Sequence, residues 1–182
     1  MTKSVNDTAL DDTAFNDTLM AAVKDEQPMW HREAPKRFWD PSRKLIKSIR
    51  DHQAICQSRA PFKAIRKKIC SIRYRFWSAV SGAEIPQSVV LGGGFFIPHP
   101  NGVVIHNHAK IGINCMLFQQ VTLAGAVELG DHVDIGAGAK LLGPLKVGNN
   151  AVIGANAVVL GDVEAGTTVV GIPARVVKRA TK

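Results

Sequence analysis

A six-residue repeat of apolar residues constrains the fold of this chain more than any other feature. From residue 105 onward an aliphatic residue recurs at every sixth position, and a second, mostly smaller apolar residue follows four positions later. The leading residues are Ile105, Ile111, Leu117, Leu123, Leu129, Ile135, Leu141, Val147, Ile153 and Val159. The residues that follow are Ala109, Cys115, Val121, Val127, Val133, Ala139, Leu145, Ala151, Ala157 and Val163. A period of six fits neither a helix nor a flat strand. It is typical of a solenoid whose coil has three short strands.

The repeat starts before residue 105 but is interrupted once. It begins at Ile85, continues to Val103, and slips by two residues before Ile105 restarts the register. The slip surrounds the sequence His-Pro-Asn-Gly at 99–102. We therefore predict an all-β solenoid domain over residues 84–166, with an irregular turn at a histidine.

Residues 42–83 show helical periodicity and a strong positive charge. One apolar stripe is formed by Leu45, Ile46, Ile49 and Ile55, and a second, after Pro61, by Phe62, Ile65, Ile69, Ile72, Phe76 and Val80. The opposite face of the second helix carries Lys63, Arg66, Lys67, Arg73 and Arg75. We predict a basic α-helical cap on the open end of the solenoid. A second hypothesis, compatible with the first, is that residues 43–75 contact an anionic membrane. No motif supports nucleic-acid binding.

Charge and composition divide the rest of the chain. The net charge is +8, and residues 31–80 hold fourteen Lys and Arg against three acids, whereas residues 1–30 hold six acids and two bases. We expect residues 1–41 to form a mobile acidic tail and a Pro-rich linker, and residues 167–182 a basic C-terminal segment. No apolar run reaches the ~18 residues that span a bilayer, and no signal peptide is visible. A cytoplasmic protein is expected, peripheral at the inner membrane face if the basic helices bind lipid.

Two groups of residues have the chemistry of a catalytic or metal site. Glu84 stands fifteen residues before His99, close to one coil, so a carboxylate could orient an imidazole general base. The alternative is an exposed glutamate and a turn histidine. His106-Asn107-His108 invites a zinc site, but the i, i+5 histidine spacing of zinc-dependent solenoid enzymes is absent, so no metal is expected. Cys115 occupies an inward position and is interpreted as a buried filler.

Four motifs over about residues 84–178 resemble serine acetyltransferases. They are 96–105 (FIPHPNGVVI), 119–125 (QQVTLAG), 135–140 (IGAGAK) and 170–177 (VGIPARVV). The resemblance implies a left-handed parallel β-helix of hexapeptide repeats. It also implies a homotrimer with active sites between subunits, and direct acetyl transfer from acetyl-CoA to a hydroxyl group.

The resemblance also implies site residues, position by position. His99 matches the catalytic base, Glu84 the aspartate that pairs with it, and Gly125 the residue whose backbone N–H stabilises the oxyanion. The cofactor is expected to lie against Gly125, Ala137 and Ala155, with its phosphates near Arg175, Lys178 and Arg179. The acceptor is expected near Pro98, Asn101, His106 and His108.

The sequence departs from serine acetyltransferases where they hold serine. Pro98 replaces an aspartate next to the catalytic histidine, and the chain runs from Gly125 straight into the next repeat without the loop that carries an Arg-His pair. The helical N-terminal domain is also short. These losses argue against free serine as the acceptor. The resemblance to short, loop-deleted members of the family implies instead a saccharide hydroxyl in exopolysaccharide, capsule or lipopolysaccharide synthesis. Serine is the first alternative, and a non-catalytic scaffold is the second.

Overall fold

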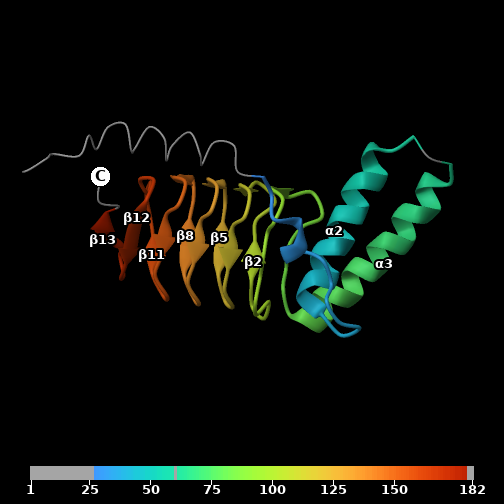
Figure 1. Ribbon diagram of the computed structural model, residues 1–182, viewed down its shortest axis with the longest axis horizontal. Coiled ribbons are helices and arrows are strands. Elements are labelled where there is room, and N and C mark those ends of the chain that lie inside the picture. Colours follow the sequence, from blue (N-terminus) through green and yellow to red (C-terminus); the bar gives the residue numbers. More distant parts are fainter. Residues whose placement is uncertain (1–26, 60, 180–182) are drawn as a thin grey trace, which may run out of the picture. The chain divides into compact units, whose positions relative to one another are not determined.

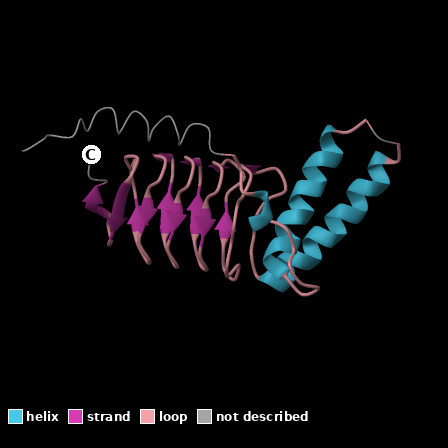
Figure 2. Cartoon of the chain, viewed as in Figure 1, coloured by secondary structure: helices cyan, strands magenta, loops and turns pink. Residues whose placement is uncertain are grey.

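A computed structural model describes residues 27–59 and 61–179. The tail expected over residues 1–26 lies outside the described residues. The repeat folds as predicted into a left-handed parallel β-helix with two helices at its N-terminal end (Figures 1 and 2).

Three sheets form the faces of the solenoid, and successive coils add parallel strands to them. The β1 sheet contains β1 (Val90–Leu91), β3 (Lys110–Ile111), β6 (Val127–Leu129) and β9 (Leu145–Val147). The β2 sheet contains β2 (Val104–Ile105), β5 (Thr122–Ala124), β8 (Lys140–Leu142) and β11 (Val158–Val159). The β4 sheet contains β4 (Met116–Leu117), β7 (Asp134–Ile135), β10 (Val152–Ile153), β12 (Thr167–Val170) and β13 (Arg175–Arg179).

The solenoid interior is built from the residues of the repeat. Every leading aliphatic from Ile105 to Val159 is buried, as is the apolar residue four positions after each. Stacked coils bury each aliphatic against the ones above and below it, while backbone hydrogen bonds join the coils. This arrangement satisfies the backbone of very short strands that would not be stable alone.

The coil length changes at both ends of the solenoid. The central coils repeat after eighteen residues, as in the pair Thr122↔Lys140. The first coil takes twenty, because Glu84 bridges to Val104. The last takes sixteen, because Val147 bridges to Val163.

Two predicted positions in the repeat are corrected by these lengths. Val103 ends a longer turn and occupies the smaller i+4 position before Ile105, and Val163 takes the position of a leading aliphatic. The solenoid also continues past residue 166, since β12 pairs in parallel with β10 before β13 turns back antiparallel.

Helix α2 (Pro41–Gln57) closes the first coil. It begins at a proline that follows the N-cap Asp40, whose side chain accepts a hydrogen bond from the Arg43 N–H. Leu45, Ile46 and Ile49 are fully buried in the same core as the first-coil residues. Ser42 Oγ and Gln53 Nε2 donate to the carbonyl groups of Ile97 and Val89, so polar groups at the open end of the coil are also paired.

Helix α3 (Lys63–Ser81) packs differently from the expectation. Its predicted apolar stripe, Phe62, Ile65, Ile69, Ile72, Phe76 and Val80, is exposed. The buried residues of the helix are instead Cys70 and Ser81, and Tyr74 and Trp77 pack against the core. The Tyr74 hydroxyl donates to the Ile85 carbonyl at 2.9 Å, which directs this narrow side of α3 to the solenoid. Neither α2 nor α3 is long and apolar enough to cross a membrane.

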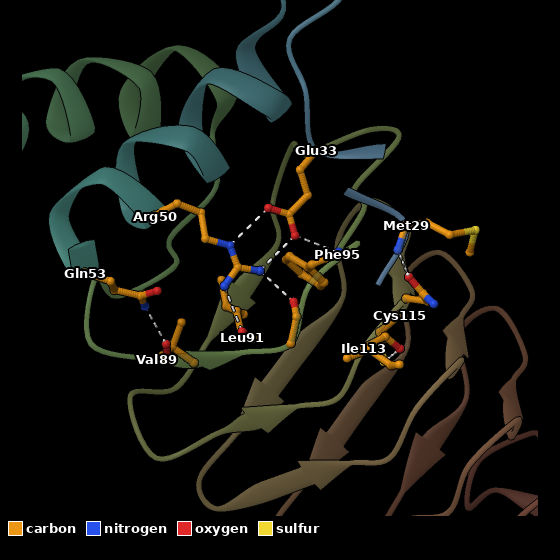
Figure 3. A network of polar contacts seen from close by, with 11 residues as sticks. Met29, Glu33, Arg50, Gln53, Val89, Leu91, Phe95, Ile113 and Cys115 are labelled. Atoms are coloured by element: carbon orange, nitrogen blue, oxygen red, sulfur yellow. Dashed lines mark hydrogen bonds and ion pairs between the residues drawn. The ribbon is translucent and has the colours of Figure 1, made fainter. Parts of the chain in front are cut away.

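Residues 28–40, here called the strap, run from the β-helix to α2 and include the 3-10 helix η1 (Trp30–Arg32). Glu33 is buried and joins Arg50 of α2 at 2.8 Å while accepting a hydrogen bond from the Phe95 N–H (Figure 3). Arg50 also donates to the carbonyl groups of Leu91 and Gly92. A buried ion pair is tolerated only when its remaining polar atoms are satisfied, as they are here. The strap, α2 and the first coil therefore form one hydrogen-bonded unit.

The strap packs closely on Gly93 of the first coil. A Cβ on Gly93 would lie 2.6 Å from Cβ of Pro28 and 2.7 Å from the Trp30 ring. We expect Gly93→Ala to displace the strap, to destabilise the fold by about 1–3 kcal/mol, and to speed tryptic cleavage after Arg32 and Lys36. Urea unfolding and timed proteolysis measure both effects.

Gly161→Ala is the matched control, because nothing lies within 4 Å of a Cβ at Gly161. Equal cleavage rates in the two variants would contradict close packing of the strap on Gly93.

Candidate functional site

One corner of the solenoid brings together the predicted base and two of the predicted cofactor residues. It joins the β4 sheet to the β2 sheet and is formed by residues 98–102, 118–120, 136–138 and 154–156 of successive coils; we call it the His99 corner. A ladder of backbone hydrogen bonds links its levels, from Gln120 N–H to Asn101, from Gly138 N–H to Gln119, and from Asn156 N–H to Ala137. The regular coil length thus aligns the His99 turn with Ala137 and Ala155.

His99 lies in the five-residue turn that the two inserted residues create. Its side chain is exposed, between the half-buried Pro98 and Pro100. Gly102 ends the turn with φ +71°, a conformation that glycine adopts without steric penalty. The insertion therefore places the exposed His99 side chain on a longer turn, whereas the later coils have short turns at this corner.

Glu84 is at the same corner, but not directly beneath His99. Its backbone pairs with Val104, five residues after His99, because the first coil has twenty residues. Both side chains are exposed, and no hydrogen bond joins them in the described chain. The spacing of fifteen residues thus brings the two to one corner without fixing their side chains against each other.

Gly125 lies at a different corner, between the β2 and β1 sheets. Ala124, beside it, stacks on the coil of His106, whose N–H donates to the Leu123 carbonyl. His106 and His108 are exposed here, with ring centroids 5.0 Å apart. Among residues 27–59 and 61–179, no cluster of three His, Cys, Asp or Glu side chains suits a metal. Within one chain, the β2 sheet separates His99 from Gly125, His106 and His108.

Two of the predicted cofactor residues, Ala137 and Ala155, follow the His99 corner toward the C-terminal end, whereas Gly125 does not. Ala137 is half-buried and Ala155 is exposed, each one coil from the next. At about 4.8 Å per coil, Ala155 lies roughly 14 Å along the stack from the His99 level. Beyond it, the Val158 N–H donates to the Gly171 carbonyl, and β13 with Arg175, Lys178 and Arg179 follows this turn. The corner thus leads from an imidazole past small side chains to Arg175 at the start of β13, which then runs back along β12.

Sequence reasoning missed two features of this corner. The Gln119 side-chain oxygen is buried without a hydrogen-bond partner in the described residues. Gln119 lies eighteen residues before Ala137, so the repeat alone could have placed it in the same column as the predicted cofactor residues.

The second feature is a groove of about 320 Å³ between the strap, the start of α2 and the His99 turn. Lys36, Arg37, Trp39, Pro98 and Pro100 are among its lining residues. The strap reaches the His99 turn only through tertiary packing, so the repeat in the sequence does not predict this groove.

A larger hollow of about 610 Å³ lies elsewhere, over the β1 sheet. Its charged lining residues are Glu128, Lys146, Asp162 and Glu164. This mainly acidic surface suits the phosphates of a nucleotide cofactor less well than the basic end of the His99 corner.

Comparison with known proteins identifies the family. A solved serine O-acetyltransferase from Brucella melitensis is 30% identical, with a TM-score of 0.66, and the match covers 93% of this chain and 70% of that one. The chain belongs to the serine acetyltransferase family of hexapeptide-repeat acyltransferases. The serine acetyltransferase of Synechococcus elongatus is 45% identical over 109 residues, which are 56% of this chain and 45% of that protein.

A serine acetyltransferase solved in complex with CoA is 33% identical, with a TM-score of 0.65 over 76% of this chain and 57% of that one. No family model matches the chain. The chain spans about half the length of the curated serine acetyltransferases that it matches.

The Cys115 thiol is not placed for nucleophilic chemistry. It donates to the Gly130 carbonyl inside the solenoid, and burial raises its pKa to about 12. Burial also raises the pKa of Cys70, whose thiol donates to the Ser48 carbonyl. A raised pKa leaves these groups as neutral thiols, which do not attack disulfide reagents.

We therefore expect only Cys56, which is exposed, to react quickly with a disulfide reagent near pH 8. The Cys115 thiolate fraction at that pH is about one in ten thousand, so Cys115 should react only on unfolding. Absorbance counts the released thiolate in the native and the denatured protein, and three thiols should react after denaturation. Rapid labelling of native Cys115, located by peptide mapping, would be evidence against a closed interior.

Proposed function

We propose that the protein is an acetyl-CoA-dependent O-acetyltransferase. The observation that carries the proposal is the His99 corner, where one hydrogen-bonded ladder connects the His99 turn with Ala137 and Ala155 and ends beside a basic strand. Small side chains at Ala137 and Ala155 let the pantetheine arm lie against the backbone. Arg175, Lys178 and Arg179 would meet the phosphates. Membership of the family, and the solved relative in complex with CoA, support this cofactor.

In the proposed reaction His99 takes the proton of an acceptor hydroxyl as general base. The hydroxyl oxygen attacks the thioester carbonyl carbon, the C–S bond breaks, and the CoA thiolate leaves with the proton held by the imidazolium. Glu84 would orient and stabilise that imidazolium from the same corner. The Gly125 N–H would donate to the oxyanion in the tetrahedral intermediate.

The separation of two corners supports a homotrimer. In one chain His99 and Gly125 lie at opposite ends of the β2-sheet strands, and thus at two different corners. This separation supports a site that uses His99 of one subunit and Gly125 of another. A neighbouring subunit whose Gly125 corner meets the His99 corner would complete the site. His106 and His108 of that neighbour would then stand near the acceptor.

Serine is the acceptor that the relatives favour. They are named serine acetyltransferases, and this supports serine over the saccharide expected from the sequence. A saccharide stays a second candidate because of one observation: Trp39, 60% exposed, lines the groove beside the His99 turn. An exposed aromatic ring offers a flat apolar surface to a sugar ring.

Loss of the base should remove the chemistry and leave cofactor binding intact. We expect His99→Ala to lower thiol release from acetyl-CoA about 10²–10⁴-fold, and Glu84→Gln to lower kcat more than it changes acetyl-CoA affinity. A thiol-trapping assay gives the rates and calorimetry gives the affinity. His52→Asn on α2 is the histidine control. An unchanged rate in His99→Ala would refute the general-base role.

The acceptor can be identified with the purified full chain. If serine is the acceptor, L-serine should saturate thiol release and mass spectrometry should detect O-acetylserine, with little effect of Trp39→Ala. Activity on saccharide acceptors alone, reduced about tenfold in Trp39→Ala, would favour the second candidate. If neither L-serine nor a saccharide supports thiol release, both candidates are excluded.

A further inference from the structure

An apolar face of α3 has no partner in the described chain, although its spacing is that of a packed helix. Ile65, Ile69, Ile72 and Phe76 follow one another at intervals of four, three and four residues, so they form one stripe. Each is more than half exposed, from 52% for Phe76 to 62% for Ile72. The residues with which α3 contacts the rest of the fold, Cys70, Tyr74 and Trp77, lie on a different side.

Basic side chains border this stripe on both sides. At 100° per residue, Arg66 and Arg73 lie along one edge, and Lys68 and Arg75 along the other. Lys63 and Lys67 bring the helix to six basic residues, and the sequence Lys63–Ser81 contains no Asp or Glu. Arg73 pairs with Asp51 of α2, whereas Arg66, Lys68 and Arg75 are exposed.

Aromatic residues extend the apolar surface at the C-terminal half of α3. Phe76 contacts Trp77 edge-on at 5.0 Å between ring centroids, and Trp77 contacts Trp39 of the strap at 5.7 Å. The neighbouring Phe38 is 90% exposed. Trp and Phe beside Lys and Arg are the residues that place a helix at the level of lipid headgroups.

We propose that α3 docks on the surface of an anionic phospholipid bilayer, with the stripe inserted between acyl chains and the two basic edges at the headgroups. The positive charge argues for this occupant. A second copy of the chain would bring two helices of six basic residues face to face, and their repulsion opposes that contact. A bilayer with anionic headgroups supplies both the apolar interior and the negative charge that this face lacks. The proposal does not depend on the acetyltransferase activity.

Co-sedimentation of the full chain with vesicles tests the proposal. We expect binding to vesicles of phosphatidylcholine and phosphatidylglycerol, at least about tenfold weaker binding to phosphatidylcholine alone, and a decrease as salt is raised. The triple variant Ile65→Ser, Ile69→Ser, Ile72→Ser and the double variant Arg66→Gln, Arg75→Gln should each bind at least about tenfold more weakly. All five side chains are exposed, so circular dichroism should stay unchanged.

The matched control removes two positive charges from the solenoid, Lys110→Gln and Lys146→Gln, and should bind like the wild type. Equal binding to both kinds of vesicle, or no binding by the wild type, would overturn the proposal. So would a wild-type assembly that dissociates in the isoleucine variant without any vesicle binding. Sedimentation velocity measures that dissociation, which would mean that the stripe contacts a second copy of the chain.

Discussion

The stacking of one coil on the next is the constraint on which the rest of this structure depends. Each coil is too short to bury its aliphatic residues alone, so it is stable only when another coil covers it. Parallel backbone hydrogen bonds then fix the register at eighteen residues, and residues one repeat apart share a face or a corner. A site on such a scaffold is a column of residues. The His99 corner is such a column, and its chemistry changes along it from an imidazole to small residues and then to Arg175 at the start of β13.

The first and the last coil of the solenoid are covered by different elements. At the N-terminal end, α2 inserts Leu45, Ile46 and Ile49, and the Glu33–Arg50 pair satisfies backbone groups of the first coil. At the C-terminal end, β13 folds back on β12. Because α2 and the strap already cover the first coil, only a narrow side of α3 is needed for packing. The apolar stripe of α3 stays available for another surface.

The active site proposed for this protein would draw on two chains. The proposed base, His99, and the proposed oxyanion donor, Gly125, lie at two different corners, with the strands of the β2 sheet between them. Assembly of identical chains is the physical way to join two corners of a three-sided scaffold. The acceptor would then be held by groups from the strap, the His99 turn and a neighbouring corner. A missing loop in one chain therefore does not by itself define the acceptor, and serine stays the acceptor that the relatives favour.

The sequence by itself determined the solenoid, its core and the corner at which His99 lies. Those features follow from a local period, and a period of six predicts which side chains point inward without knowledge of distant contacts. It did not determine the side of α3 that packs, because an apolar stripe on a helix predicts burial only if a partner is present. Tertiary structure decided that α2 and the strap take the end of the first coil, leaving Ile65, Ile69 and Ile72 exposed. It also decided that Glu84 pairs with Val104 rather than stacking under His99, since the first coil takes twenty residues and His99 is only fifteen residues after Glu84.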